Sequence, residues 1–314
     1  MNGAKPEETL TREEPGRQRD APDTPRRRLT AILLMCAAVL CFACLDASAK
    51  WASRHVDPMV TTWFRYASNV VLLSIVLNGW TVPRIMHSNR LGLQVGRSLL
   101  LFLSTILNFL ALQYLQLTQV ISIQFAMPLL VALLAGPILG EWVGPRRLAA
   151  IAVGFLGILV ITRPGTGSLH PAMLLTVANT VCYALYAIAT RMLAGYDSPA
   201  TTMTYGGLAG LALMTPILPF IWVTPPSPLV WIALLGTGLL GAVGHGLLTI
   251  AHTRAPASLL SPFIYTQIVW TTTLGYLLFG DLPDRWTLLG AAIIITSGLY
   301  LLSRERTVRE RKRG

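Results

Sequence analysis

Three ionisable side chains within the apolar segments of this 314-residue chain could do chemistry: Asp46, Arg65 and His245. A carboxylate and an imidazole can exchange protons, and a guanidinium can hold a carboxylate or phosphate through two hydrogen bonds. Two other interpretations stay open. Asp46 and Arg65 could form an ion pair between helices, and His245 could be a neutral residue bonded to a backbone carbonyl.

Amide and aromatic side chains form a second candidate set. Asn179, Tyr183 and Tyr186 recur at i, i+4 and i+7, so they share one face of a helix. Aromatic faces with a few amides suit a flat, moderately polar organic molecule, although aromatic side chains also pack helices. The predicted substrate-binding residues are Asn108, Gln124, Asn179, Tyr183, Tyr186, Tyr265, Gln267 and Trp270.

Several kinds of site are not indicated by the sequence. No spacing of His and Cys resembles a metal site, and no GxxxxGK[ST] loop for nucleotide phosphates occurs. The ionisable groups within apolar segments are too few for the converging acids and bases of an enzyme, and no ring of like charges indicates a channel. We therefore expect no enzymatic activity, no metal and no cofactor.

These side chains must be positioned by membrane helices. The mean hydropathy is +0.57, and 53% of residues are hydrophobic while only 12% are charged. About 20 apolar residues in a helix cross a bilayer, and backbone polar groups in lipid must be satisfied within the chain. We therefore expect an all-α polytopic membrane protein with ten spans, at 29–49, 59–78, 97–115, 118–139, 148–162, 171–190, 200–222, 229–251, 257–279 and 286–302.

The net charge of +11 is explained by topology rather than by nucleic-acid binding. Lys and Arg concentrate in both tails and in alternate loops, which predicts that both termini are cytoplasmic and that the protein lies in the inner membrane. Residues 1–28 are rich in Pro, Arg and Glu and are expected to be a disordered tail. Residues 305–314 are expected to be a second, basic tail.

The chain also repeats itself. Lys50 matches Arg191 at an offset of 141 residues, and Gly140-Glu141 matches Gly280-Asp281 at 140. The predicted repeats cover 29–163 and 170–304, with five spans each. Because five is odd and the loops are short, the second repeat is expected to be inverted in the membrane, with a cavity between the two halves.

This pattern resembles the drug/metabolite transporter superfamily, in its ten-span branch with two EamA-type repeats. The resemblance covers residues 29–304 and includes the Gly-acidic turns, the spaced small residues Gly290 and Gly298, and Arg65. It implies a secondary carrier that works by alternating access, with the substrate in a central cavity.

We therefore expect a carrier that moves a small organic metabolite, such as an amino acid or a related compound, across the inner membrane. The alternative is an uptake carrier for an aromatic vitamin such as riboflavin, and an integral-membrane enzyme is a remote third. The expected partners are the small-molecule substrate and the lipid bilayer, and the protein is expected to be a monomer or a homodimer.

Overall fold

The computed structural model describes residues 25–76, 85–165 and 170–311, in which every regular element is an α-helix. This confirms the predicted all-α fold. The helices are α1 (Pro25–Ala52), α2 (Pro58–Val76), α3 (Leu91–Tyr114), α4 (Leu117–Gln124), α5 (Met127–Leu139), α6 (Pro145–Thr162), α7 (Ala172–Leu193), α8 (Pro199–Met214), α9 (Leu218–Ile221), α10 (Pro228–Arg254), α11 (Ala257–Ile264), α12 (Gln267–Phe279) and α13 (Arg285–Arg311).

Eight segments are helical, apolar and long enough to cross a membrane, with α4 and α5 counted as one. The other two predicted spans are interrupted within the described residues. Span 200–222 corresponds to the 16-residue α8 followed by the short α9, and span 257–279 is divided between α11 and α12. The chain is therefore a polytopic membrane protein of two five-span repeats, α1–α6 and α7–α13.

Local sequence explains where the helices begin and end. Pro58, Pro145 and Pro228 occupy the first helical position, where a missing N–H costs nothing. Gly140 and Gly280 end α5 and α12 in the left-handed conformation, with φ of 73° and 71°. The two repeats therefore use the same cap to place the acidic residue that follows each glycine.

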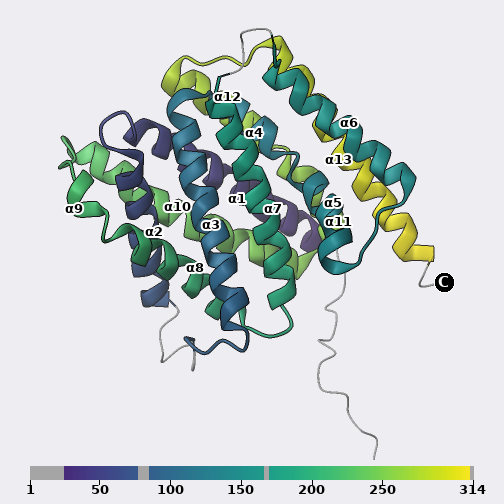
Figure 1. The fold of residues 1–314 in the computed structure, drawn as a ribbon, viewed down its shortest axis with the longest axis horizontal. Coiled ribbons are helices and arrows are strands. Elements are labelled where there is room, and N and C mark those ends of the chain that lie inside the picture. The colour runs from purple at the N-terminus through teal and green to yellow at the C-terminus, as the bar shows by residue number, and fades with distance from the viewer. Residues whose placement is uncertain (1–24, 77–84, 166–169, 312–314) are drawn as a thin grey trace, which may run out of the picture.

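The repeats meet along α6 and α13, which lie side by side at one edge of the molecule (Figure 1). Gly157 and Gly290 bring the two backbones together: a Cβ on Gly157 would lie 2.8 Å from the Gly290 carbonyl oxygen, and the reverse contact would be 2.5 Å. Larger residues would therefore separate these equivalent helices.

Two helix breaks are buried inside the molecule. Phe125 ends α4 and Tyr265 ends α11, 140 residues apart. Their rings meet edge to face, with centroids 5.0 Å apart. The equivalent breaks of the two repeats therefore touch, as discontinuous helices do around binding sites in transporters built from inverted repeats.

Several expected boundaries differ from the structure. Helix α1 begins at Pro25, so only residues 1–24 of the expected N-terminal tail lie outside the described residues. Helix α3 begins at Leu91 rather than 97, and α13 continues through Arg311 into the expected C-terminal tail. Hydropathy locates the apolar part of a helix, but polar residues extend these helices beyond it.

Candidate functional site

Two adjoining cavities, which together we call the chamber, lie between the repeats. The larger has a volume of about 470 Å³ and the smaller about 240 Å³. Arg65, Tyr183 and His245 line both cavities, so the two are lobes of one space. Ligand sites commonly measure about 300–1,000 Å³, so the chamber is large enough for a small metabolite.

Glycines on α10 allow the helices around the chamber to approach closely. A Cβ on Gly238 would lie 2.5 Å from the carbonyl oxygen of Arg65 in α2, and one on Gly244 would lie 2.7 Å from the Phe42 ring in α1. A Cβ on Gly241 would lie 2.6 Å from Nη1 of Arg65. The spacing of three residues places these glycines along one face of α10, against α1 and α2.

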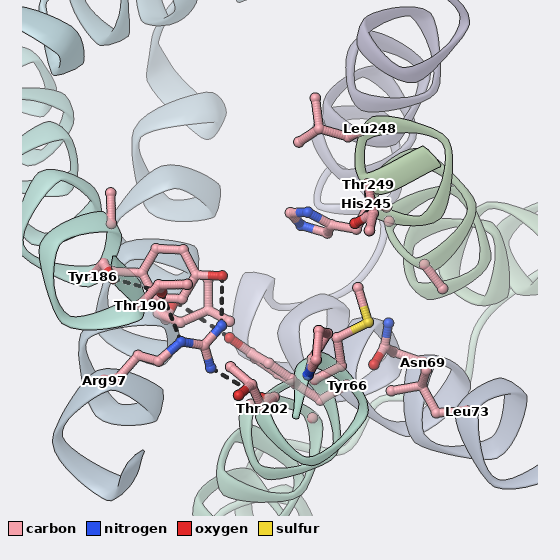
Figure 2. Close-up of a pocket in the computed structure, with 18 of the residues that line it drawn as sticks. Tyr66, Asn69, Leu73, Arg97, Tyr186, Thr190, Thr202, His245, Leu248 and Thr249 are labelled. Atoms are coloured by element: carbon pink, nitrogen blue, oxygen red, sulfur yellow. Dashed lines mark hydrogen bonds between the residues drawn. The ribbon is translucent and has the colours of Figure 1, made fainter. Parts of the chain in front are cut away.

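Arg97 is a chamber residue that the sequence reasoning missed, because it stands at the very start of the predicted span 97–115 and was grouped with the basic residues of the loop before it. It lies within α3, is only 4% exposed, and lines the larger cavity. Its Nε donates to Thr190 Oγ1 at 2.7 Å, Nη1 to the Thr202 carbonyl at 3.0 Å, and Nη2 to the Tyr186 hydroxyl at 2.8 Å (Figure 2). Arg97 therefore joins α3 to α7 and α8, across the chamber from His245 (Figure 2).

The wall of the larger lobe is aromatic. The rings of Tyr183 and Tyr186 stack with centroids 5.2 Å apart and an angle of 29° between planes. On α2, the Tyr66 hydroxyl donates to Thr105 Oγ1 at 2.9 Å. The predicted stripe on α7 thus faces the chamber and presents flat apolar surface to it.

The smaller lobe is lined by amides that bond to one another. Gln124 Nε2 and Asn179 Nδ2 donate to Asn108 Oδ1 at 2.7 and 3.4 Å, and Ser104 donates to Asn179 Oδ1 at 2.5 Å. Gln267 lines the same lobe. The structure therefore brings together these four predicted amide residues from α3, α4, α7 and α12.

Asp46 and Arg65 both line the smaller lobe, but they do not form an ion pair among the described residues. Asp46 Oδ1 instead accepts from Asn108 Nδ2 at 3.0 Å. His245 lies over the Phe42 ring, with centroids 5.0 Å apart. The interhelical ion pair considered from the sequence is thus not formed.

Two predicted site residues lie away from the chamber. Tyr265 and Trp270 are not among the residues that line either lobe. Tyr265 packs against Phe125 and next to Gly298, and Trp270 packs on the cluster that contains Met35. Both side chains contribute to the packing between helices.

One end of the chamber is closed by a buried contact, which we call the Lys50 seal: Lys50, Leu115 and Asp281. Lys50 Nζ bonds to Asp281 Oδ2 at 2.9 Å and to the Leu115 carbonyl at 2.7 Å, and its side chain is only 8% exposed. Nearby, the hydroxyls of Thr118 and Thr272 join α4 to α12 at 3.1 Å. The seal therefore connects the ends of α1, α3 and α12.

The equivalent contact at the other end is open to water. Arg191 pairs with Glu141 through two bonds of 2.8 and 2.5 Å, but these side chains are 56% and 50% exposed. Helices α4 and α5 of the first repeat correspond to α11 and α12 of the second. In the described part of the chain α4 packs against α12, whereas the equivalent pair, α11 and α5, makes no comparable contact. The structure is thus closed at the Lys50 end and more open at the Arg191 end.

A third ion pair lies in the loops at the Lys50 end. Arg163 Nη2 lies 2.7 Å from Asp284 Oδ2, and the Thr287 N–H donates to Asp284 Oδ1 at 2.7 Å. Burial alone would raise the pKa of Asp284. The Thr287 hydrogen bonds and the charges of Arg163 and Arg285 outweigh burial and lower that pKa from its usual 3.8.

Comparison with known proteins identifies several relatives. A riboflavin transporter of Vibrio cholerae is 29% identical and covers 91% of this chain and 97% of its own length. A riboflavin transporter of Brucella anthropi is 27% identical, over 86% of this chain and 98% of its own length. An S-adenosylmethionine uptake transporter of Rickettsia prowazekii is 26% identical, over 83% of this chain and 88% of its own length. A protein of known crystal structure is 20% identical and aligns over 87% of this chain and 96% of its own chain. The TM-score of 0.62 shows that the two proteins share the fold.

The EamA-like transporter family matches two segments of the chain, residues 29–163 and 170–304. The family and the relatives are transporters, and the two matched segments are the two repeats whose helices surround the chamber. The chain therefore belongs to the EamA-like transporter family and is a multi-pass membrane transporter of a small molecule.

Proposed function

We propose that this protein is a secondary carrier that takes up riboflavin, or a close flavin, across the inner membrane. The observation that carries the proposal is the chamber itself. Stacked tyrosines line one lobe and converging amides the other, and riboflavin combines a flat three-ring system with amide-like ring edges and a polyol chain. The names of the relatives in Vibrio and Brucella support the same cargo.

The charge of the chamber favours riboflavin over S-adenosylmethionine. Arg65 and Arg97 line the chamber. Among the residues that the structure describes, the acids on its lining are Asp46 and Asp197. Both oxygens of Asp197 accept hydrogen bonds, one from the Ser88 hydroxyl and one from the Asn89 N–H, so both already have donors from the chain itself. Riboflavin is neutral, whereas the sulfonium of S-adenosylmethionine adds a positive charge that two arginines repel.

The transport mechanism in this proposal is alternating access between the two repeats. With both termini cytoplasmic, the Lys50 end faces outward and the described structure is open toward the cytoplasm. The Arg191–Glu141 pair is the repeat-related equivalent of the Lys50–Asp281 pair. An outward-open state would therefore bury Arg191–Glu141 and expose Lys50–Asp281. The inverted repeat thereby supplies two states of similar energy from one set of contacts.

Uptake of labelled riboflavin tests the cargo. Cells that cannot make riboflavin should take it up when they express this protein, and an excess of unlabelled riboflavin should compete far better than S-adenosylmethionine. Tyr183→Ala should reduce uptake at least tenfold at equal expression, because it removes an aromatic wall shared by both lobes. Tyr276→Ala is the matched control, since that tyrosine is 57% exposed.

No uptake of riboflavin, or competition by S-adenosylmethionine as effective as that by unlabelled riboflavin, would contradict the proposed cargo. Equal loss of uptake in the Tyr183 and Tyr276 variants would contradict the assignment of the chamber as the binding site.

A further inference from the structure

Arg65 is a cation within the membrane that forms no hydrogen bond or ion pair with the described residues; its guanidinium carbon lies 6.0 Å from the centre of the Tyr66 ring. None of its guanidinium nitrogens has a hydrogen-bond partner among the described residues, and its Nε is also shielded from solvent. An arginine within a membrane protein that lacks an acceptor is costly, so such groups usually meet one. Arg65 lines both lobes of the chamber, so that acceptor can be a group on the substrate.

The position of Arg65 is fixed by the helix that it packs against. Its Nη1 lies so close to Gly241 that a Cβ there would be 2.6 Å away. Its backbone carbonyl lies against Gly238, one turn earlier on α10. The guanidinium is therefore confined between α2 and α10, and it does not depend on the ligand for its orientation.

Asp46 is held in a comparable way from the other side. Asn108 donates to Oδ1 of Asp46 and is itself oriented by Gln124 and Asn179, which both donate to its carbonyl oxygen. No hydrogen bond joins Oδ2 of Asp46 to the described residues. One carboxylate oxygen is thus fixed by the amide network, and the other remains available in the smaller lobe.

We propose that Asp46 and Arg65 together bind the imide edge of the substrate ring. In riboflavin this edge is a ring N–H between two carbonyls. The N–H would donate to Asp46 Oδ2, and a neighbouring carbonyl would accept from Arg65. Phe42 and Phe125 line the same lobe and would confine a flat ring. The inference rests on the proposed function, because it assigns the site that recognises the flavin.

A pair of ligands that differ only at the ring N–H tests this assignment. Riboflavin and 3-methylriboflavin are titrated against the purified protein, and binding is followed by quenching of flavin fluorescence. The wild type should bind riboflavin about tenfold or more tightly than the methyl analogue, because methylation removes the donor that faces Asp46. Asp46→Ala should bind the two ligands equally, and Asp46→Asn should reduce the preference.

Arg65→Gln should weaken both ligands equally, by about tenfold or more, because both keep the carbonyl. The matched controls are Asp57→Asn and Arg54→Gln, which make the same changes at exposed positions and should preserve the wild-type affinities. A purely structural role for Asp46 would lower both affinities and leave their ratio unchanged, so this ligand–variant cycle separates the two roles.

Each outcome decides one of the two proposals. Equal binding of the two flavins by the wild type would overturn the imide assignment and leave riboflavin as the cargo. An unchanged preference in both Asp46 variants would also overturn it. If the wild type binds neither flavin, the proposed cargo is wrong and the imide assignment is overturned with it.

Discussion

The Lys50 seal gives a quantitative prediction about the transport cycle. Lys50→Met keeps the length of the side chain but removes its bonds to Asp281 and to the Leu115 carbonyl. Loss of one partner from a buried ion pair costs about 3–5 kcal/mol. Because the Asp281 side chain is 28% exposed and can regain water, we expect a cost of about 2 kcal/mol here. If the seal exists in only one state, this cost shifts the equilibrium toward the other state by about 30-fold.

Cysteine labelling measures this shift. Ile121 on α4 lines the smaller lobe and is only 6% exposed, so it reports access to the chamber. Ile121→Cys is made in a variant that lacks the four native cysteines, Cys36, Cys41, Cys44 and Cys182. A maleimide that cannot cross the membrane is then added at the Lys50 face. Lys50→Met should accelerate labelling by up to about 30-fold, as estimated from the equilibrium shift.

Two further variants complete the test. Arg54 lies over the same Phe279 ring as Lys50 but is exposed, so Arg54→Met should leave the labelling rate unchanged. Exchange of the charges, Lys50→Asp with Asp281→Lys, should slow labelling again relative to Lys50→Met. Equal labelling of the wild type and Lys50→Met would refute the view that the seal holds one state of the carrier.

Three other predictions concern stability, measured as thermal unfolding in detergent. Gly238→Ala should lower stability by about 2 kcal/mol or more, because the new Cβ would meet the α2 backbone. Gly236→Ala on the same helix has open space around the new Cβ and should not lower stability. Equal effects of the two substitutions would contradict the packing described. Arg97→Gln should cost about 2–4 kcal/mol through its three lost hydrogen bonds, and an unchanged melting temperature would argue against its role as a link. Asp284 has a lowered pKa when folded, so its contribution is present above its unfolded pKa of 3.8 and is lost as pH falls through the folded value. The difference in stability between wild type and Asp284→Asn should therefore shrink on acidification, and a difference that grows would contradict the sign.

The repeat and its consequences could be read from the sequence because they depend on spacing. The offset between Lys50 and Arg191 is preserved in the structure as two ion pairs, each of which joins one repeat to the other. Which acid each base would meet could not be predicted, because it depends on the distance between helix ends. That distance follows from the glycine caps and from the close packing of the helices.

Arg97 was missed for a physical reason. A span predicted to begin at residue 97 places the arginine at the membrane surface beside a loop, whereas the helix begins at Leu91 and buries Arg97. One signal could have identified it: Arg97, Leu101, Ser104 and Asn108 recur at i, i+4, i+7 and i+11, which is one face of a helix. An arginine that shares a helix face with Ser104 and Asn108, two polar residues within an apolar span, is expected to point into the bundle rather than to the surface.

Trp270 shows the opposite limit of sequence reasoning. Gln267 and Trp270 lie three residues apart, so they were expected to share a face of the helix, but only Gln267 lines the chamber. Both residues lie in α12, after the break at Tyr265, and residues three apart in an α-helix differ in direction by about 60° around the axis. That difference is enough to place Gln267 on the chamber and the Trp270 ring on the cluster that contains Met35, so spacing alone could not separate a lining residue from a packing residue.

Counterflow in proteoliposomes tests the central claim most directly, namely that the chamber between the repeats carries a flavin by alternating access. Vesicles that contain the purified protein are loaded with unlabelled riboflavin and diluted into labelled riboflavin. The account predicts saturable, transient accumulation of label above the equilibrium level, and loss of that accumulation in Tyr183→Ala. Linear influx that does not depend on the internal load, or no flux of riboflavin at all, would contradict it.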